Sequence, residues 1–339
     1  MVVTEIIGTI GRELGLGRGQ VASAVALFDD GNTIPFVARY RKEATGSLDE
    51  VAVTAIRDQL HSLTEIARRR AVISESLATQ GALTAALQQQ LEAATTLARL
   101  EDIYLPFRPK RRTRGMIARE KGLDPLAQAL FRQQPSPVDP RPYIAPEKGV
   151  PSAEEALAGA RDIIAENISE DLPTRAGLRR LFQDRAIISS KVLKKHQDQG
   201  AKFRDYFDWQ EPAARAPGHR LLAMFRGENE KVLTLTVRPP EDMALDDLAA
   251  RHLRSSPARQ QVELALADGY RRLLAPSLEN EMRRELKTRA DREAITVFAA
   301  NLRDLLLAPP LGEKRVLALD PGFRTGAKLV CLDGQGRLL

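Results

Sequence analysis

Apolar residues recur every three or four positions over long stretches of this chain, and this spacing predicts a mainly α-helical fold. One such stripe consists of Val53, Ile56, Leu60, Leu63, Ala67, Ile73 and Leu77. Ser47 begins the sequence Ser-Leu-Asp-Glu, a capping box that predicts the start of a helix running to about Gly81. A second stripe, from Leu83 to Leu97, follows a short turn. We therefore expect two helices paired as an antiparallel hairpin.

More helices are expected in the second half of the chain. Ser152 opens a second capping box, Ser-Ala-Glu-Glu, ahead of an apolar stripe that reaches Ile168. Shorter helices are predicted around 178–182 and 187–193. They could contain a helix-turn-helix, although short helices turn in this way in many all-α folds. The segment 219–238 has the alternation and the turn of a β-hairpin. A long helix is predicted over 277–307, ended by a pair of prolines.

The prolines and the C-terminal strands suggest where domains begin and end. Six prolines between Pro135 and Pro151 exclude a helix or an inner strand, which predicts an extended connector. We expect a helical region at 1–134, the connector at 135–151, a helical central region at 152–312 and a different domain from 313 to 339. In that last part, 314–320 and 327–333 have the pattern of strands, and 337–339 that of a third. Two strands and a stub leave unpaired edges, so we expect an N-terminal fragment of a longer protein.

Composition narrows the classes of function. The net charge of +6 and the pI near 9.5 permit a polyanionic partner but do not require one, because basic and acidic residues are mostly interspersed. No stretch is apolar enough to span a membrane, and the N-terminus lacks the basic start of a signal peptide. Cys331 is the single cysteine, which excludes a disulfide framework and a Cys-rich zinc site. These features predict a cytoplasmic protein without a cofactor.

Two basic segments are candidates for contact with nucleic-acid phosphates. The denser one contains Arg108, Lys110, Arg111, Arg112, Arg114, Arg119 and Lys121. Its prolines predict a surface loop that leads into a helix, and its cations either contact phosphates or are solvated and paired with acids. The second segment holds Arg39, Arg41 and Lys42. The apolar residues just before it favour an internal structural network, with phosphate contact as the second interpretation.

Asp320 is the candidate catalytic residue. It follows an apolar strand and opens the turn Asp-Pro-Gly, the position in which metal-dependent nucleases of RNase H-like fold place a first carboxylate. Such nucleases hold two divalent metal ions with several carboxylates, and Asp333 is poorly placed to be a partner. Asp-Pro-Gly is equally a turn signal. We therefore expect no catalysis from this chain by itself.

Three long motifs occur in order along the chain, and together they resemble the Tex family of bacterial transcription accessory proteins. They are TIPFVARYRKEATGSLDE, YLPFRPKRRTRGMIAREKGLDPLA and VLALDPGFRTGAKL. The resemblance implies an elongated, mainly helical scaffold with a helix-turn-helix, followed by a YqgF domain of RNase H-like fold. It implies that 314–339 begin that YqgF domain. It also implies later helix-hairpin-helix modules and a C-terminal OB-fold domain, to which nucleic-acid binding is chiefly credited.

The resemblance gives the function expected of the chain, which is a non-catalytic, nucleic-acid-binding scaffold in transcription, monomeric and with RNA or DNA as partner. Two alternatives belong to other classes. One is an RNase H-like nuclease that uses Asp320 and divalent metal in a longer protein. The other is a pure protein-interaction scaffold on the transcription machinery.

Overall fold

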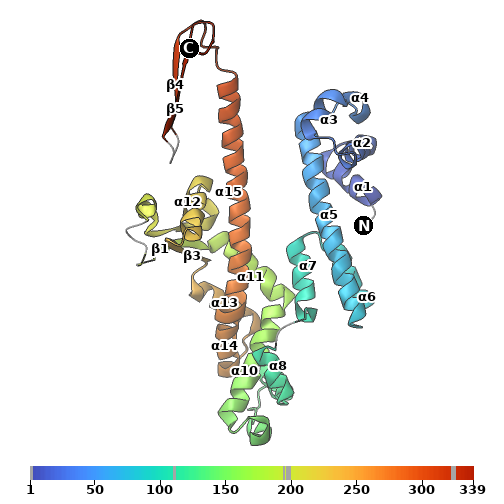
Figure 1. The fold of residues 1–339 in the computed structure, drawn as a ribbon. Coiled ribbons are helices and arrows are strands. Elements are labelled where there is room, and N and C mark those ends of the chain that lie inside the picture. Colours follow the sequence, from blue (N-terminus) through green and yellow to red (C-terminus); the bar gives the residue numbers. More distant parts are fainter. Residues whose placement is uncertain (1–2, 110–111, 194, 196–199, 322–325) are drawn as a thin grey trace. The chain divides into compact units, whose positions relative to one another are not determined.

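The computed structural model describes residues 3–109, 112–193, 195, 200–321 and 326–339. The described chain is mainly helical with small antiparallel sheets, which confirms the expected fold class (Figure 1). It forms two compact units. The first comprises Met1–Leu181 with Glu241–Leu278, and the second comprises Phe182–Pro240 with Glu279–Leu339. Among the described residues, no helix is both long and apolar enough to cross a membrane.

The first unit begins with four short helices, of which the first three pack on the N-terminal part of a long helix and the fourth packs on the second and third (Figure 1). They are α1 (Val3–Leu14), α2 (Arg18–Asp29), α3 (Ile34–Tyr40) and α4 (Lys42–Thr45), and the long helix is α5 (Glu50–Thr79). The predicted capping box at Ser47 is wrong. Ser47 has φ 64°, so the chain is still turning there. Asp49 is the cap instead, and its carboxylate accepts a hydrogen bond from the Ala52 amide at 2.7 Å.

The C-terminal half of α5 packs against α6 (Ala85–Ala93) and α7 (Leu97–Tyr104). The expected helical hairpin is therefore present, but its second arm is two helices. The break occurs because Thr96 caps α7 by accepting a hydrogen bond from the Arg99 amide at 3.2 Å. On α5, Arg70 donates to the carbonyls of Leu91 and Ala94 at 2.8 and 2.9 Å, which satisfies the end of α6.

The central helix in the rest of the first unit is α10 (Ala153–Glu170). Helices α8 (Arg114–Glu120), α9 (Asp124–Arg132) and α14 (Arg259–Gly269) pack on it, α11 (Leu172–Arg185) follows it in the chain, and α13 (Glu241–His252) packs on α14. Ser152 caps α10 as predicted, accepting from the Glu155 amide at 3.2 Å. The Pro-rich segment has only two single-turn 3-10 helices, η2 (Arg141–Tyr143) and η3 (Pro146–Lys148). The segment 135–151 thus contains neither an α-helix nor an inner strand, as its prolines predicted.

The second unit contains a three-stranded antiparallel sheet in the order β2 (Asp208–Pro212), β1 (Ile187–Val192), β3 (Leu233–Arg238). The helix predicted at 187–193 is wrong, since β1 pairs with a strand on each side. The helix-turn-helix that this helix would have completed is therefore not formed. The β-hairpin predicted near 219–238 is also wrong. Its first half is helix α12 (Gly218–Asn229), which buries Leu221 and Met224 at helical spacing, and its second half alone is a strand.

Helix α15 (Ala275–Leu306) begins at the end of the first unit and continues in the second unit, where a strand pair follows it. The bounds of α15 confirm the long helix predicted over 277–307. Strands β4 (Val316–Pro321) and β5 (Ala327–Leu332) pair antiparallel, which confirms the two strands predicted in this segment. The third predicted strand is reduced to one bridge between Leu332 and Leu338. Both faces of the strand pair carry exposed apolar side chains, a pattern typical of strands covered on both sides.

Candidate nucleic-acid interface

The denser basic segment lies between the end of α7 and the start of α8, in the first unit. Arg108 is exposed and forms no ion pair or side-chain hydrogen bond with a described residue. Arg112 is exposed but pairs with Glu120 at 2.5 Å. Lys110 and Arg111 lie outside the described residues. The described residues that flank these two, Arg108 and Arg112, are exposed and precede helix α8, as predicted for a surface loop that leads into a helix. The charge of Arg112 is partly neutralised by Glu120.

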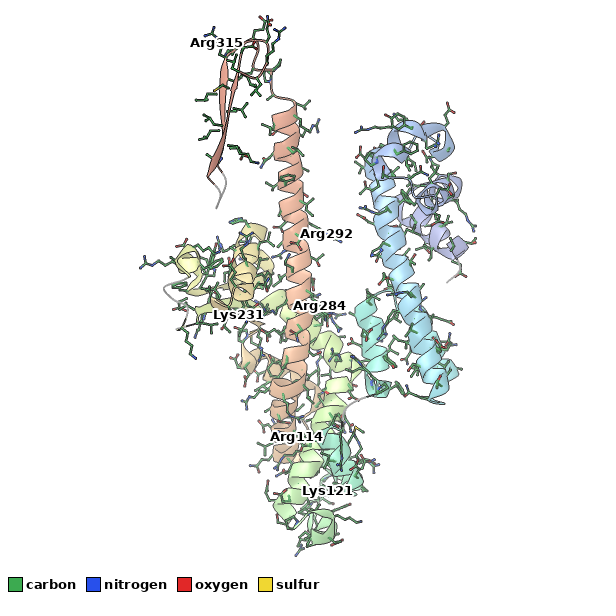
Figure 2. All side chains as sticks on the ribbon, in the orientation of Figure 1. Arg114, Lys121, Lys231, Arg284, Arg292 and Arg315 are labelled. Carbon is green, nitrogen blue, oxygen red and sulfur yellow. The ribbon has the colours of Figure 1, made fainter. Side chains whose placement is uncertain are left out.

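Arg114 is in the first turn of helix α8, and a hydrogen bond to α10 holds this end of α8 in place. Thr113 caps α8 by accepting from the Met116 amide at 3.0 Å, and its hydroxyl donates to Glu166 of α10, also at 3.0 Å. Gly115 packs against the same carboxylate, where a Cβ atom would lie 2.2 Å from Oε2 of Glu166. Arg114 itself is exposed (Figure 2), and the negative charge of Asp162 attracts it.

The last two cations of the dense segment have structural partners. Arg119 donates to Glu166 at 2.6 Å and to the side-chain oxygen of Asn167 at 2.7 Å. Lys121, at the other end of α8 (Figure 2), donates to the Gly149 carbonyl at 2.8 Å and so holds the Pro-rich segment. These contacts leave Arg108 and Arg114 as the described cations of this segment best placed for a phosphate.

The second basic segment occupies α3 and α4, and the structure places it differently from the expectation. Arg39, Arg41 and Lys42 are all exposed and form no ion pair with a described residue. The expected internal structural network is therefore wrong, because Val37 and Ala38 supply the buried side of α3 instead. The guanidinium carbon of Arg41 lies 5.1 Å from the ring centroid of Phe36. The two segments lie on different elements, since α3 packs on α5 whereas α8 packs on α10.

Sequence reasoning missed one prominent residue of the second segment. Tyr40 is 69% exposed, and its ring centroid lies 5.4 Å from that of Phe36 at an interplanar angle of 45°. The signal was present in the sequence, because Phe36 and Tyr40 are four residues apart and lie on the same face of a helix as Arg39. An exposed aromatic ring between cations is a common feature of surfaces that bind nucleic acid.

Other basic residues of the first unit form buried ion pairs. Asp102 of α7 is 2% exposed, and its two oxygens accept from Arg175 at 2.6 Å and Arg179 at 2.8 Å. Arg175 also donates to the Ser169 carbonyl and the Ser277 hydroxyl. Paired buried charges of this kind fix the packing of helices and offer nothing to an external phosphate.

Asp320 lies near the end of β4, opposite Lys328 of β5, and is exposed. Most of the turn that follows it, 322–325, lies outside the described residues. Asp333 is occupied in a turn, where Oδ1 accepts from the amides of Gln335 and Arg337 at 2.8 and 2.9 Å. In the part of the chain that the structure describes, no group of three or more His, Cys, Asp and Glu could hold a metal ion.

Comparison with known proteins gives two family matches. The Tex-like protein N-terminal domain matches residues 4–78, and the Tex central region-like family matches residues 134–298. The chain is 40% identical to transcriptional accessory protein Tex of Neisseria gonorrhoeae, over 100% of this chain and 45% of that protein. It is 42% identical to protein tex of Bordetella pertussis, over 98% of this chain and 44% of that protein.

A more distant relative is the human S1 RNA-binding domain-containing protein 1, which is 30% identical over 94% of this chain and 34% of that protein. The chain thus spans less than half the length of these curated relatives.

Proposed function

This chain belongs to the Tex family, and on that premise we propose that it is a nucleic-acid-binding scaffold that acts in transcription. Relatives bear the names transcriptional accessory protein and S1 RNA-binding domain-containing protein, which supports this class of role. The observation that carries the proposal is the surface of α3 and α4. There Arg39, Arg41 and Lys42 are exposed beside Tyr40 and have no described acidic partner.

The chemistry of these cations suits the phosphate backbone. Each guanidinium or ammonium that meets a phosphate releases condensed counterions, so binding weakens steeply as salt rises. Contacts of this kind position a strand without reading its sequence. Arg108, before helix α8, and Arg114, in its first turn, are further exposed cations of the same unit.

The non-catalytic part of the proposal rests on the chemistry near Asp320. Two-metal hydrolysis needs several carboxylates around the ions, and the one acidic residue that follows Asp320 in the sequence, Asp333, is engaged by backbone amides. A nuclease remains the alternative for a longer protein. Cleavage of labelled RNA or DNA by this chain with Mg²⁺ or Mn²⁺, lost in Asp320→Asn, would contradict the scaffold proposal.

The experiment that tests binding is fluorescence anisotropy with a labelled single-stranded RNA and a labelled DNA duplex across a salt series. We compare the parent chain with R39E/R41E/K42E and with R108E/R112E/R114E. The matched control is R57E/R68E/R99E, which changes the net charge equally at exposed arginines of α5 and α7.

We expect the parent to bind with a steep salt slope, the control to bind like the parent, and the first triple variant to lose affinity and part of the slope. If the parent and all variants fail to bind at low salt, nucleic-acid binding by this chain is refuted. The protein-interaction scaffold would then be the better interpretation.

A further inference from the structure

The outward face of α3 carries two aromatic rings that the core does not use. The rings of Phe36 and Tyr40 pack on this face at a tilted angle of 45°, while Val37 and Ala38 are buried where α3 packs against α5. Tyr40 is 69% exposed, so most of its ring is open to contact from solvent. The ring is therefore displayed to solvent by the way α3 is packed.

Positive charge surrounds these rings. The Arg41 guanidinium lies over Phe36, and Arg39 and Lys42 are exposed on either side of Tyr40 in sequence. Between 34 and 45 the only acidic residue is Glu43, so the segment carries a net charge of +2 (three cations less one carboxylate). A flat ring flanked by cations suits a flat, anionic ligand, whose π-face meets the ring while its phosphates meet the cations.

Hydrogen bonds from outside the segment and within it hold it in place. Gln20 of α2 accepts from the Gly17 amide and donates to the Gly46 carbonyl, both at 3.0 Å. The buried Thr45 hydroxyl donates to the Arg41 carbonyl at 3.1 Å. These bonds tie the end of α4 to the start of α2, so the rings and cations are presented by a fixed backbone, which lowers the ordering cost of binding.

We propose that this face binds an unpaired nucleic-acid strand, with one base stacked on Tyr40 and the flanking phosphates held by Arg39, Arg41 and Lys42. The inference rests on the proposed function and specifies its substrate as a single strand. In a duplex the base faces are covered by neighbouring pairs, so a protruding ring gains nothing from it. Every base has a π-face, so the same arrangement tolerates all sequences.

The test compares Tyr40→Leu with Tyr40→Phe in the full 339-residue chain. The probes are a single-stranded oligonucleotide containing 2-aminopurine and a duplex of the same sequence. Base–aromatic stacking of about 1–3 kcal/mol corresponds to a loss of about 5- to 150-fold in single-strand affinity for Tyr40→Leu. We expect Tyr40→Phe to keep the parent affinity and the quenching of 2-aminopurine, since the ring remains. Tyr143→Leu, at a partly exposed tyrosine of the Pro-rich segment, is the matched control and should bind like the parent.

The outcomes separate this inference from the proposed function. If the parent binds the single strand and Tyr40→Leu lowers affinity for single strand and duplex equally, or for neither, the stacking site is wrong while nucleic-acid binding stands. If the parent binds neither probe, the proposed function fails. Unfolding curves from circular dichroism check that each variant is folded, and Tyr40→Ser provides a second ring deletion should leucine promote aggregation.

Discussion

The Thr113 hydroxyl donates a hydrogen bond to the Glu166 carboxylate at 3.0 Å, and this contact joins residues 53 positions apart in sequence. The same hydroxyl oxygen caps α8, so one side chain sets both the start of the helix and its attachment to α10. Glu166 is only 6% exposed and also pairs with Arg119. The basic segment before Thr113 is therefore fastened at its C-terminal end by a buried carboxylate.

Gly115→Ala tests this attachment. The new methyl group would lie 2.2 Å from Oε2 of Glu166, so α8 or the carboxylate must move. Overpacking of this kind costs about 1–3 kcal/mol of unfolding free energy, measured by urea denaturation. Gly122→Ala is not a suitable control because φ is 86° there, whereas Gly19→Ala meets no atom within 4 Å. A Gly115→Ala variant as stable as Gly19→Ala would contradict the close packing.

Asp102→Ala should be among the most damaging substitutions in the first unit. It leaves Arg175, whose side chain is 7% exposed, buried without its carboxylate, and it also removes the partner of Arg179. Removing one member of a buried ion pair costs about 3–5 kcal/mol. Asp58→Ala breaks the exposed pair with Arg57 and should cost about 1 kcal/mol or less. Equal losses for the two variants in thermal or urea unfolding would show that the Asp102 network adds no stability.

Stability should depend on pH through His252. Burial lowers the pKa of His252 below its ordinary value of 6.5, outweighing the attraction of Asp171. The Thr174 hydroxyl donates to Asp171, so Nε2 of His252 donates to the Thr174 oxygen at 2.7 Å. Because the unfolded chain binds a proton more readily, this residue's contribution to stability falls as pH drops below 6.5 toward the native pKa.

The measurement is the difference in unfolding free energy between the parent and His252→Gln at a series of pH values. Glutamine cannot titrate but keeps a donor for Thr174, so the difference isolates the imidazole. We expect the parent to lose stability relative to the variant on acidification below pH 6.5. A difference that is flat with pH, or of opposite sign, would refute the lowered pKa.

The C-terminal half of α15 should bind hydrophobic dyes. Ile295, Phe298, Leu302, Leu305 and Leu306 are 41–74% exposed and fall on one face at helical spacing. Single apolar residues are common on protein surfaces, but a continuous apolar stripe of five residues is not. Phe298→Glu with Leu302→Glu should lower ANS fluorescence of the folded chain, whereas Thr296→Glu with Arg303→Glu, on the polar side, should not. Unchanged fluorescence in the first variant would show that the stripe is covered in solution.

Helices with a strong local pattern could be predicted from the sequence. The apolar stripe of α5, the Ser152 cap of α10 and the two prolines after α15 involve residues only a few positions apart. The short apolar runs of β4 and β5 on either side of a Pro-Gly turn are equally local. Backbone propensity, capping and periodicity depend on residues within one or two turns of each other, so they can be recognised in the sequence.

Other features depend on contacts between residues far apart in the chain, which no local sequence pattern reveals. Ile187–Val192 is a strand because β2 and β3, from separate parts of the chain, satisfy its backbone on both edges. Arg175 and Arg119 are removed from any external role by Asp102 and Glu166, which lie 73 and 47 residues away. Tyr40 and its neighbouring cations are exposed because Val37 and Ala38 fill the space against α5. The sequence alone determined which side chains can carry charge or stack on a base, whereas the packing of helices against one another determined which of them face the solvent.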